Sequence, residues 1–124
     1  MVLALLPLLA PRATLADEQG ADADHPGYAR YIETCARCHQ PDGAGLPGLY
    51  PRLNSAPHLW VDRSRAIRAV LSGRTGPLES ADRHFDHTMP NHGHLANEVV
   101  AETLSFLQDA WGPGGAAFTA EEVA

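Results

Sequence analysis

Apolar side chains recur at the spacing of an α-helix in three separate parts of the chain. The first group consists of Tyr28, Tyr31, Ile32 and Cys35. This spacing predicts a short helix that begins near Gly27, and Pro41 ends it because proline has no N–H to continue the hydrogen-bond ladder. The helix carries both cysteines of the chain at its C-terminal end.

A second helix is predicted after Asp62 or Ser64, because either side chain can accept a hydrogen bond from the first turn. Its buried face is formed by Ala66, Ile67, Val70 and Leu71. Its exposed side carries Arg63, Arg65 and Arg68. Gly73 is expected to end this helix, since glycine adopts the left-handed conformation that follows a helix C-terminus.

The third helix is predicted from about Asn97 to Trp111, where Gly112 and Pro113 end it. Residues on one stripe of this helix are Val100, Leu104, Leu107 and Trp111. Residues 41–57 and 74–94 are rich in turn formers and lack a helical or strand period, so we expect both to be loops. The predicted fold class is all-α, with three or more short helices joined by long loops.

Both ends of the chain differ in composition from the middle. Residues 1–16 are expected to be a secretory signal peptide, with an apolar run from Val2 to Ala10 and cleavage after Ala16. The run is shorter than the roughly 20 apolar residues of a spanning helix, so we expect no permanent membrane span. The apolar run is not preceded by the basic residues that usually open a signal peptide, so the true translation start is left open.

Four segments therefore divide the chain. The signal peptide is followed by a mobile acidic leader at 17–26, a folded domain at 27–112 and a frayed C-terminal tail at 113–124. Export places the mature protein in the periplasm.

The charge balance is acidic. The chain has 15 Asp and Glu against nine basic residues, all of them arginine, which gives a formal net charge of −6. Such a chain is repelled by a phosphate backbone, so nucleic acid is excluded as a partner. A chain of 124 residues also has room for only one small core, which a large apolar cofactor would help to organise.

The two cysteines lie in the segment Cys35-Ala36-Arg37-Cys38-His39. The pattern C-x-x-C-H is typical of c-type haem attachment. Two thiols three residues apart on a helical turn can both reach the vinyl groups of one porphyrin, and the next residue can present an imidazole to the iron. We therefore predict one covalent haem c on Cys35 and Cys38, with the iron bound to His39.

Two other uses of the cysteines are weaker. A thioredoxin-type redox pair needs a βαβ context, and no strand is predicted here. A zinc site could combine both cysteines with two later histidines, but these histidines lack the usual finger spacing.

Met89 is the predicted second axial ligand. If Met1 leaves with the signal peptide, no other methionine remains, and Met89 lies in a predicted loop before Pro90 where a side chain can approach the far face of the haem. A thioether ligand raises the reduction potential, as suits an electron carrier. The competing ligands, each otherwise a solvated loop side chain, are His84, His87 and His92.

Over residues 27–112 the chain resembles class I c-type cytochromes, in particular the bacterial group associated with periplasmic dehydrogenases such as the quinoprotein alcohol dehydrogenases. The residues that carry this resemblance in the N-terminal half are Gly27, Tyr31, Cys35, Cys38, His39, Asp42, Gly43, Gly45, Pro47, Pro51 and Leu53. Those in the C-terminal half are Gly73, Gly76, Pro77, Phe85, Met89, Pro90, Trp111 and Gly112. The resemblance implies a cytochrome c-like fold around one haem.

The resemblance also implies roles for single residues. Gly27 would lie where the first and last helices cross, against Phe106 or Leu107. The carbonyl of Pro51 would accept a hydrogen bond from His39, and Trp60 and Arg74 would face the haem propionates. Cytochromes that dock through a ring of lysines are not the pattern for a chain without lysine, so docking would use the haem edge, arginines or acidic patches.

The expected function is one-electron transfer between a dehydrogenase as donor and an oxidase or other cytochrome as acceptor, rather than catalysis. One alternative is a tightly bound haem subunit of a dehydrogenase complex. Another is a haem peroxidase or gas sensor, in which Met89 does not bind and the sixth iron position stays open.

Overall fold

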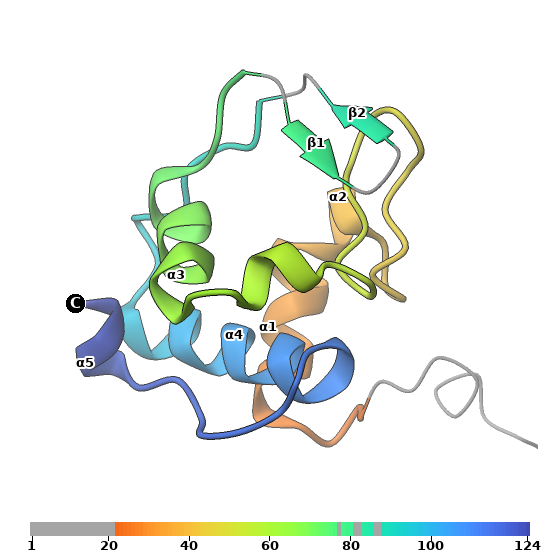
Figure 1. The fold of residues 1–124 in the computed structure, drawn as a ribbon. Helices are drawn as coiled ribbons and strands as arrows, with labels where there is room; N and C mark the ends of the chain where they lie inside the picture. The colour runs from red at the N-terminus through yellow and green to blue at the C-terminus, as the bar shows by residue number, and fades with distance from the viewer. Residues whose placement is uncertain (1–21, 77, 81–82, 86–87) are drawn as a thin grey trace, which may run out of the picture.

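The structure, a computed structural model, describes residues 22–76, 78–80, 83–85 and 88–124 (Figure 1). The helical elements of this part are α1 (Pro26–Thr34), α2 (Ala36–His39), the 3-10 turn η1 (Pro57–Trp60), α3 (Arg63–Ser72), α4 (Asn97–Trp111) and α5 (Ala120–Val123). The predicted all-α class is confirmed, and the predicted signal peptide lies outside the described residues. None of the helices in these ranges combines the length and apolar character needed to cross a membrane.

Helix α1 begins one residue earlier than predicted and continues almost directly into α2. The Nδ1 atom of His25 accepts a hydrogen bond from the backbone N–H of Gly27 at 3.0 Å, and Pro26 occupies the first turn. The Nε2 atom of His25 lies 3.1 Å from a carboxylate oxygen of Asp109. The last residues of the expected mobile leader therefore belong to the fold.

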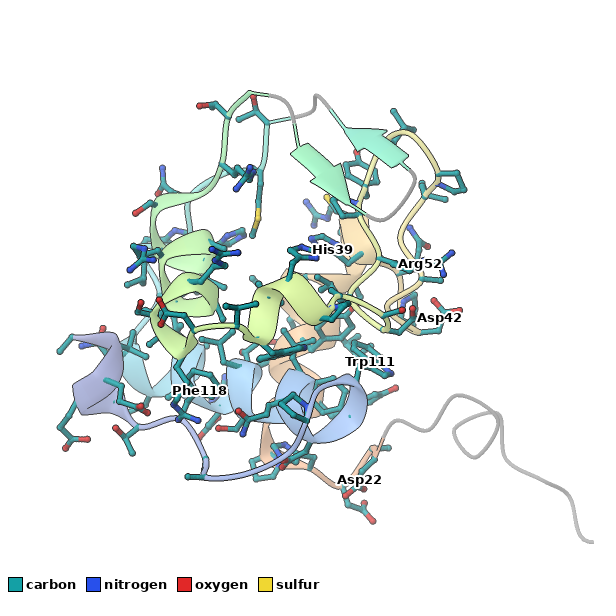
Figure 2. The ribbon with its side chains drawn as sticks, viewed as in Figure 1. Asp22, His39, Asp42, Arg52, Trp111 and Phe118 are labelled. Atoms are coloured by element: carbon teal, nitrogen blue, oxygen red, sulfur yellow. The ribbon has the colours of Figure 1, made fainter. Side chains whose placement is uncertain are left out.

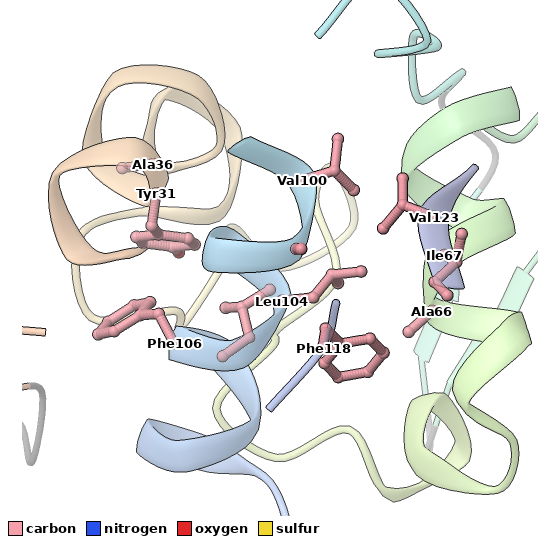
Figure 3. Close-up of a cluster of buried hydrophobic side chains, with 11 residues drawn as sticks. Tyr31, Ala36, Ala66, Ile67, Val100, Leu104, Phe106, Phe118 and Val123 are labelled. Carbon is pink, nitrogen blue, oxygen red and sulfur yellow. The ribbon is translucent and has the colours of Figure 1, made fainter. Parts of the chain in front are cut away.

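Helix α4 lies at the centre of the core, with α1 on one side and α3 on the other (Figure 3). Tyr31 of α1 and Phe106 and Trp111 of α4 pack their rings together, with centroids 5.3 to 5.5 Å apart. Gly27 permits this crossing, because a Cβ atom there would overlap the carbonyl oxygen of Glu102 and lie 2.7 Å from Cβ of Phe106. The predicted contact is thus with Phe106.

Helix α3 begins and ends as predicted. A carboxylate oxygen of Asp62 accepts a hydrogen bond from the backbone N–H of Ser64 at 2.8 Å, which caps the first turn. Gly73 ends the helix with a φ of 67°. Ala66 and Ile67 point into the core beside α4 (Figure 3).

The prediction of a frayed C-terminal tail is wrong. Phe118 and Val123 are only 5% and 3% exposed, and they pack into the core between α3 and α4 (Figure 3). Arg63 was expected on the exposed side of α3, but its guanidinium lies 3.9 Å from the ring centroid of Phe118. The sequence does not reveal this packing, because Phe118 and Val123 are too far apart to form a helical or strand period.

Residues 74–94, predicted to be a loop, contain a small antiparallel hairpin of β1 (Leu78–Ser80) and β2 (Arg83–Phe85). An isolated antiparallel bridge joins Arg74 to Met89. It lies four residues outward from the Leu78–Phe85 pair on each strand, so it continues the register of the hairpin. Strands of three residues are too short to show a period of two in sequence.

Candidate haem-binding site

A cavity of about 430 Å³ opens between α1, α2 and the segment that follows α3. Of the seven predicted site residues, those that line it are Cys35, Cys38, His39, Pro51, Arg74 and Met89. These residues are up to 54 positions apart in sequence, so only the tertiary fold brings them together.

His39 is held by its side chain and its backbone. Its Nδ1 atom lies 2.7 Å from the carbonyl oxygen of Pro51. Because a carbonyl can only accept, Nδ1–H is the donor and the lone pair of Nε2 remains available. The carbonyl of His39 accepts a hydrogen bond from the N–H of Gly45 at 2.9 Å. Figure 2 shows the ring pointing from α2 into the interior of the fold.

The loop after α2 comes close enough for the carbonyl of Pro51 to accept the hydrogen bond from His39, because Gly45 has no side chain. A Cβ atom on Gly45 would overlap the carbonyl of Tyr50 and lie 2.7 Å from the carbonyl oxygen of Pro51. The φ of 63° at Gly45 is also one that glycine adopts without strain. The loop sequence therefore places the acceptor for His39.

The protonation states of this side of the cavity follow from burial. Burial lowers the pKa of His39, more than the hydrogen bond to Pro51 raises it, and a charge on His92 lowers it further. The imidazole is therefore neutral at pH 7, which is the form that binds metals.

Burial, and next the charge of Cys38, raise the pKa of the Cys35 thiol to about 11. Redox-active cysteines need a thiolate, so this environment disfavours the thioredoxin-type alternative. Among the described residues, no group of three or more His, Cys, Asp and Glu side chains comes together as a metal site.

Met89 lines the same cavity and lies in the segment that follows the hairpin. Its backbone N–H donates to the carbonyl of Arg74 at 2.8 Å, and its own carbonyl accepts from the N–H of Arg74 at 2.9 Å. Gly73 allows this approach, since a Cβ atom there would overlap the carbonyl oxygen of Met89. The methionine backbone is thus fixed at the base of the hairpin.

Trp60 is the predicted site residue that does not line the cavity. It packs against the core, where its ring lies next to Gly112. Its Nε1 atom is buried and has no hydrogen-bond partner among the described residues.

Several lining residues were not predicted from the sequence, namely Leu49, Tyr50, Pro90, His94 and Leu95. No sequence signal distinguishes these from other loop residues, because loop side chains carry no period. Among the competing ligands, His92 lines the cavity, while the side chains of His84 and His87 lie outside the described part of the structure.

The residues present fit a haem. Two thiols, an imidazole and a thioether line one cavity, and the apolar side chains that line it with them include Leu49, Pro51 and Leu95. A largely apolar cavity that presents an imidazole and a thioether matches the ligand set that cytochromes use for iron.

Comparison with known proteins agrees with this geometry. Over residues 25–111 the chain matches the family model described as Cytochrome c. Cytochrome c-552 of Thermus thermophilus is 33% identical over 106 residues, which cover 77% of this chain and 79% of that protein.

Two further relatives are much longer than this chain. The gluconate 2-dehydrogenase cytochrome c subunit of Pantoea cypripedii is 34% identical over 108 residues, which cover 83% of this chain and 24% of that protein. The cytochrome c subunit of the quinone alcohol dehydrogenase of Gluconobacter oxydans is 29% identical over 89 residues, covering 69% of this chain and 18% of that protein.

Proposed function

Since the chain belongs to the cytochrome c family, whose members carry covalent haem c, we propose that it is a periplasmic carrier of single electrons. Cys35 and Cys38 would attach the haem, and His39 and Met89 would supply the protein ligands of its iron. The donor is a dehydrogenase, and the acceptor is an oxidase or another cytochrome. The protein itself catalyses no reaction.

The observation that carries this proposal is that His39 and Met89 line the same cavity and that each is held by hydrogen bonds. His39 is oriented by Pro51, and Met89 is held by two hydrogen bonds to Arg74. The haem supplies the change between ferric and ferrous iron. Fixed ligands suit such a carrier, because little has to move when the charge of the iron changes.

The other residues of the site hold the haem and exclude water. The neutral imidazole of His39 donates Nδ1–H to Pro51, which makes Nε2 a stronger ligand. The guanidinium of Arg74, which lines the cavity, would bind the carboxylates at the haem edge. Apolar lining residues keep the dielectric low around the iron.

The first experiment is optical spectroscopy of the full chain, expressed in a host with c-type haem maturation. We expect a sharp low-spin α band in the reduced protein and the weak far-red charge-transfer band of Met-ligated iron in the oxidised protein. Met89→Leu should abolish the far-red band, while His94→Ala should keep it. A protein without covalent haem would overturn the proposal.

A second candidate is a fixed haem subunit of a dehydrogenase complex. It is favoured by the resemblance to the gluconate and alcohol dehydrogenase subunits, although the chain spans only 24% and 18% of their lengths. Size-exclusion chromatography of the native periplasmic protein separates the two. Elution as a small monomer supports the free carrier, and a stable heavier complex supports the subunit.

A further inference from the structure

The turn that follows α2 contains an uncommon backbone conformation. Gln40 has a φ of 68° and a ψ of 157°, a region that glycine adopts freely and that other residues rarely occupy. No other non-glycine residue in the described part of the chain has a positive φ. Such strain persists only where surrounding contacts hold it. Because Gln40 directly follows His39, the strain lies next to a predicted iron ligand.

Tyr31 supplies a contact that holds this turn. Its hydroxyl donates a hydrogen bond to the carbonyl of Gln40 at 2.6 Å, and the same carbonyl accepts one from the N–H of Gly43 at 3.0 Å. Tyr31 is fully buried, and its ring packs against Phe106 (Figure 3) and against Trp111. Because the packed ring fixes the position of the hydroxyl, this bond favours the observed conformation of the turn.

The turn determines where the loop that follows it meets His39. The N–H of Gly45 donates to the carbonyl of His39 at 2.9 Å, and Gly45 lies against the carbonyl of Pro51. That carbonyl accepts the hydrogen bond from Nδ1 of His39 at 2.7 Å. A different φ at Gln40 would change the direction of the chain before Gly45. It would thus draw the Pro51 carbonyl away from the imidazole.

On the basis of the proposed haem, we propose that Tyr31 is a positioning residue for His39. Its hydroxyl holds Gln40 in the strained turn, and the turn keeps the carbonyl of Pro51 on Nδ1 of His39. This hydrogen bond makes the imidazole a stronger ligand, which stabilises ferric iron more than ferrous iron. The hydroxyl of Tyr31 therefore lowers the reduction potential, although it acts on the iron only through His39.

The test uses the haem-loaded full chain with Tyr31→Phe, which keeps the packed ring and removes only the hydroxyl. Nuclear magnetic resonance of the reduced protein follows the exchange of the His39 Nδ1 proton with solvent. We expect this exchange to be faster by about fivefold or more, because losing one hydrogen bond raises the population of the open turn by this order. Voltammetry should show a reduction potential more positive than that of the unsubstituted protein.

Tyr28→Phe is the matched control. Tyr28 also packs its ring against Phe106, with centroids 5.6 Å apart, but the hydroxyl that donates to Gln40 is that of Tyr31. Removing the Tyr28 hydroxyl should leave the proton exchange and the potential unchanged. Equal shifts in the two variants would overturn the inference, because any hydroxyl lost from this aromatic cluster would then have the same effect.

A second substitution tests the route through the turn. Gln40→Gly in the Tyr31→Phe background should restore both the exchange rate and the potential, because glycine adopts a φ of 68° without a contact that holds it. Gln40→Ala in the same background should restore neither, because alanine keeps the Cβ atom that makes this conformation strained. Both substitutions remove the side-chain bond from Gln40 to the carbonyl of Cys38, so their difference reports the backbone alone.

An unchanged exchange rate and potential in the Tyr31→Phe protein would overturn the inference. So would a failure of Gln40→Gly to restore them, or an equal restoration by Gln40→Ala. None of these results affects the proposed electron carrier, which fails only if the unsubstituted chain lacks covalent haem or its Met89 ligand.

Discussion

At the residue scale, the absence of a side chain at Gly27 decides how closely α1 and α4 pack. Gly27 lies in α1 against the carbonyl of Glu102 and the Cβ atom of Phe106, with no room for a methyl group. Glycine weakens a helix, so its presence here is explained by the close approach of α4 rather than by helix propensity.

We expect Gly27→Ala to reduce the free energy of unfolding by about 2 kcal/mol or more, because the helices have to separate to admit the Cβ atom. Urea denaturation of the haem-loaded protein measures the change. Gly48→Ala is the control, since its Cβ atom meets no heavy atom within 4 Å. Its positive φ should cost only about 1 kcal/mol. Equal losses in the two variants would contradict the explanation.

At the element scale, the C-terminal segment 113–124 joins α3 to α4 across the core. Arg63 of α3 donates from both Nε and an Nη atom to the carboxylate of Glu122, each at 2.9 Å. It also donates to the carbonyls of Ala116 and Ala117. The N–H of Phe118 donates to the hydroxyl of Ser105 at 2.8 Å. The segment is therefore part of the packed domain.

Phe118→Ala should lower the free energy of unfolding by about 3 kcal/mol, because a buried phenyl ring is lost and a cavity remains. Denaturant unfolding followed by circular dichroism measures this loss. Val61→Ala is the control, since Val61 is 73% exposed and should change stability little. A negligible effect of Phe118→Ala would show that the segment contributes nothing to the core.

The pair of Arg63 and Glu122 should make this segment pH-dependent. Hydrogen bonds from Arg63 are the largest cause that lowers the pKa of Glu122, followed by the backbone N–H of Thr119. A lowered folded-state pKa means that the stabilisation is present above the ordinary glutamate pKa of about 4.3 and is lost as the pH falls through the folded value.

Glu122→Gln should therefore lower the urea midpoint at about pH 7 and have a smaller effect at about pH 3, because the stabilisation is lost as the pH falls below the ordinary glutamate pKa of about 4.3 towards the lowered folded-state pKa. The effect should be modest, because both side chains are exposed to solvent. Glu121→Gln, at the exposed neighbouring position, should show no such pH dependence. A constant difference at the two pH values would rule out the ion pair as its cause.

At the scale of the whole molecule, the proposed haem completes a core that the chain alone leaves open. The cavity of about 430 Å³ is lined in part by the segments that follow α2 and α3. The helices and strands described in these segments before α3 and before α4 are short. A small domain with such a void buries too little apolar surface to offset the loss of chain entropy.

The double variant Cys35→Ala, Cys38→Ala should thus lose its near-ultraviolet circular dichroism and unfold without a cooperative transition. Met89→Ala, which keeps the covalent attachment, should retain both signals. Cooperative unfolding of the double variant without haem would show that the polypeptide closes its own core.

The sequence by itself determined the features that depend on neighbours along the chain. The bounds of α4 and the end of α3 at Gly73 follow from helical period and from local hydrogen bonding, whereas the sequence left both Asp62 and Ser64 open as the cap of α3. The spacing of Cys35, Cys38 and His39 is equally local, so the haem-attachment motif is readable without a structure.

Only the tertiary structure decided the features that join distant segments. Phe118 became a core residue because α3 and α4 provide its surroundings, and the bridge between Arg74 and Met89 needed the hairpin register. The same holds for His92, which lines a cavity built from several parts of the chain. Burial is set by residues far away in sequence, and a local pattern contains no information about them.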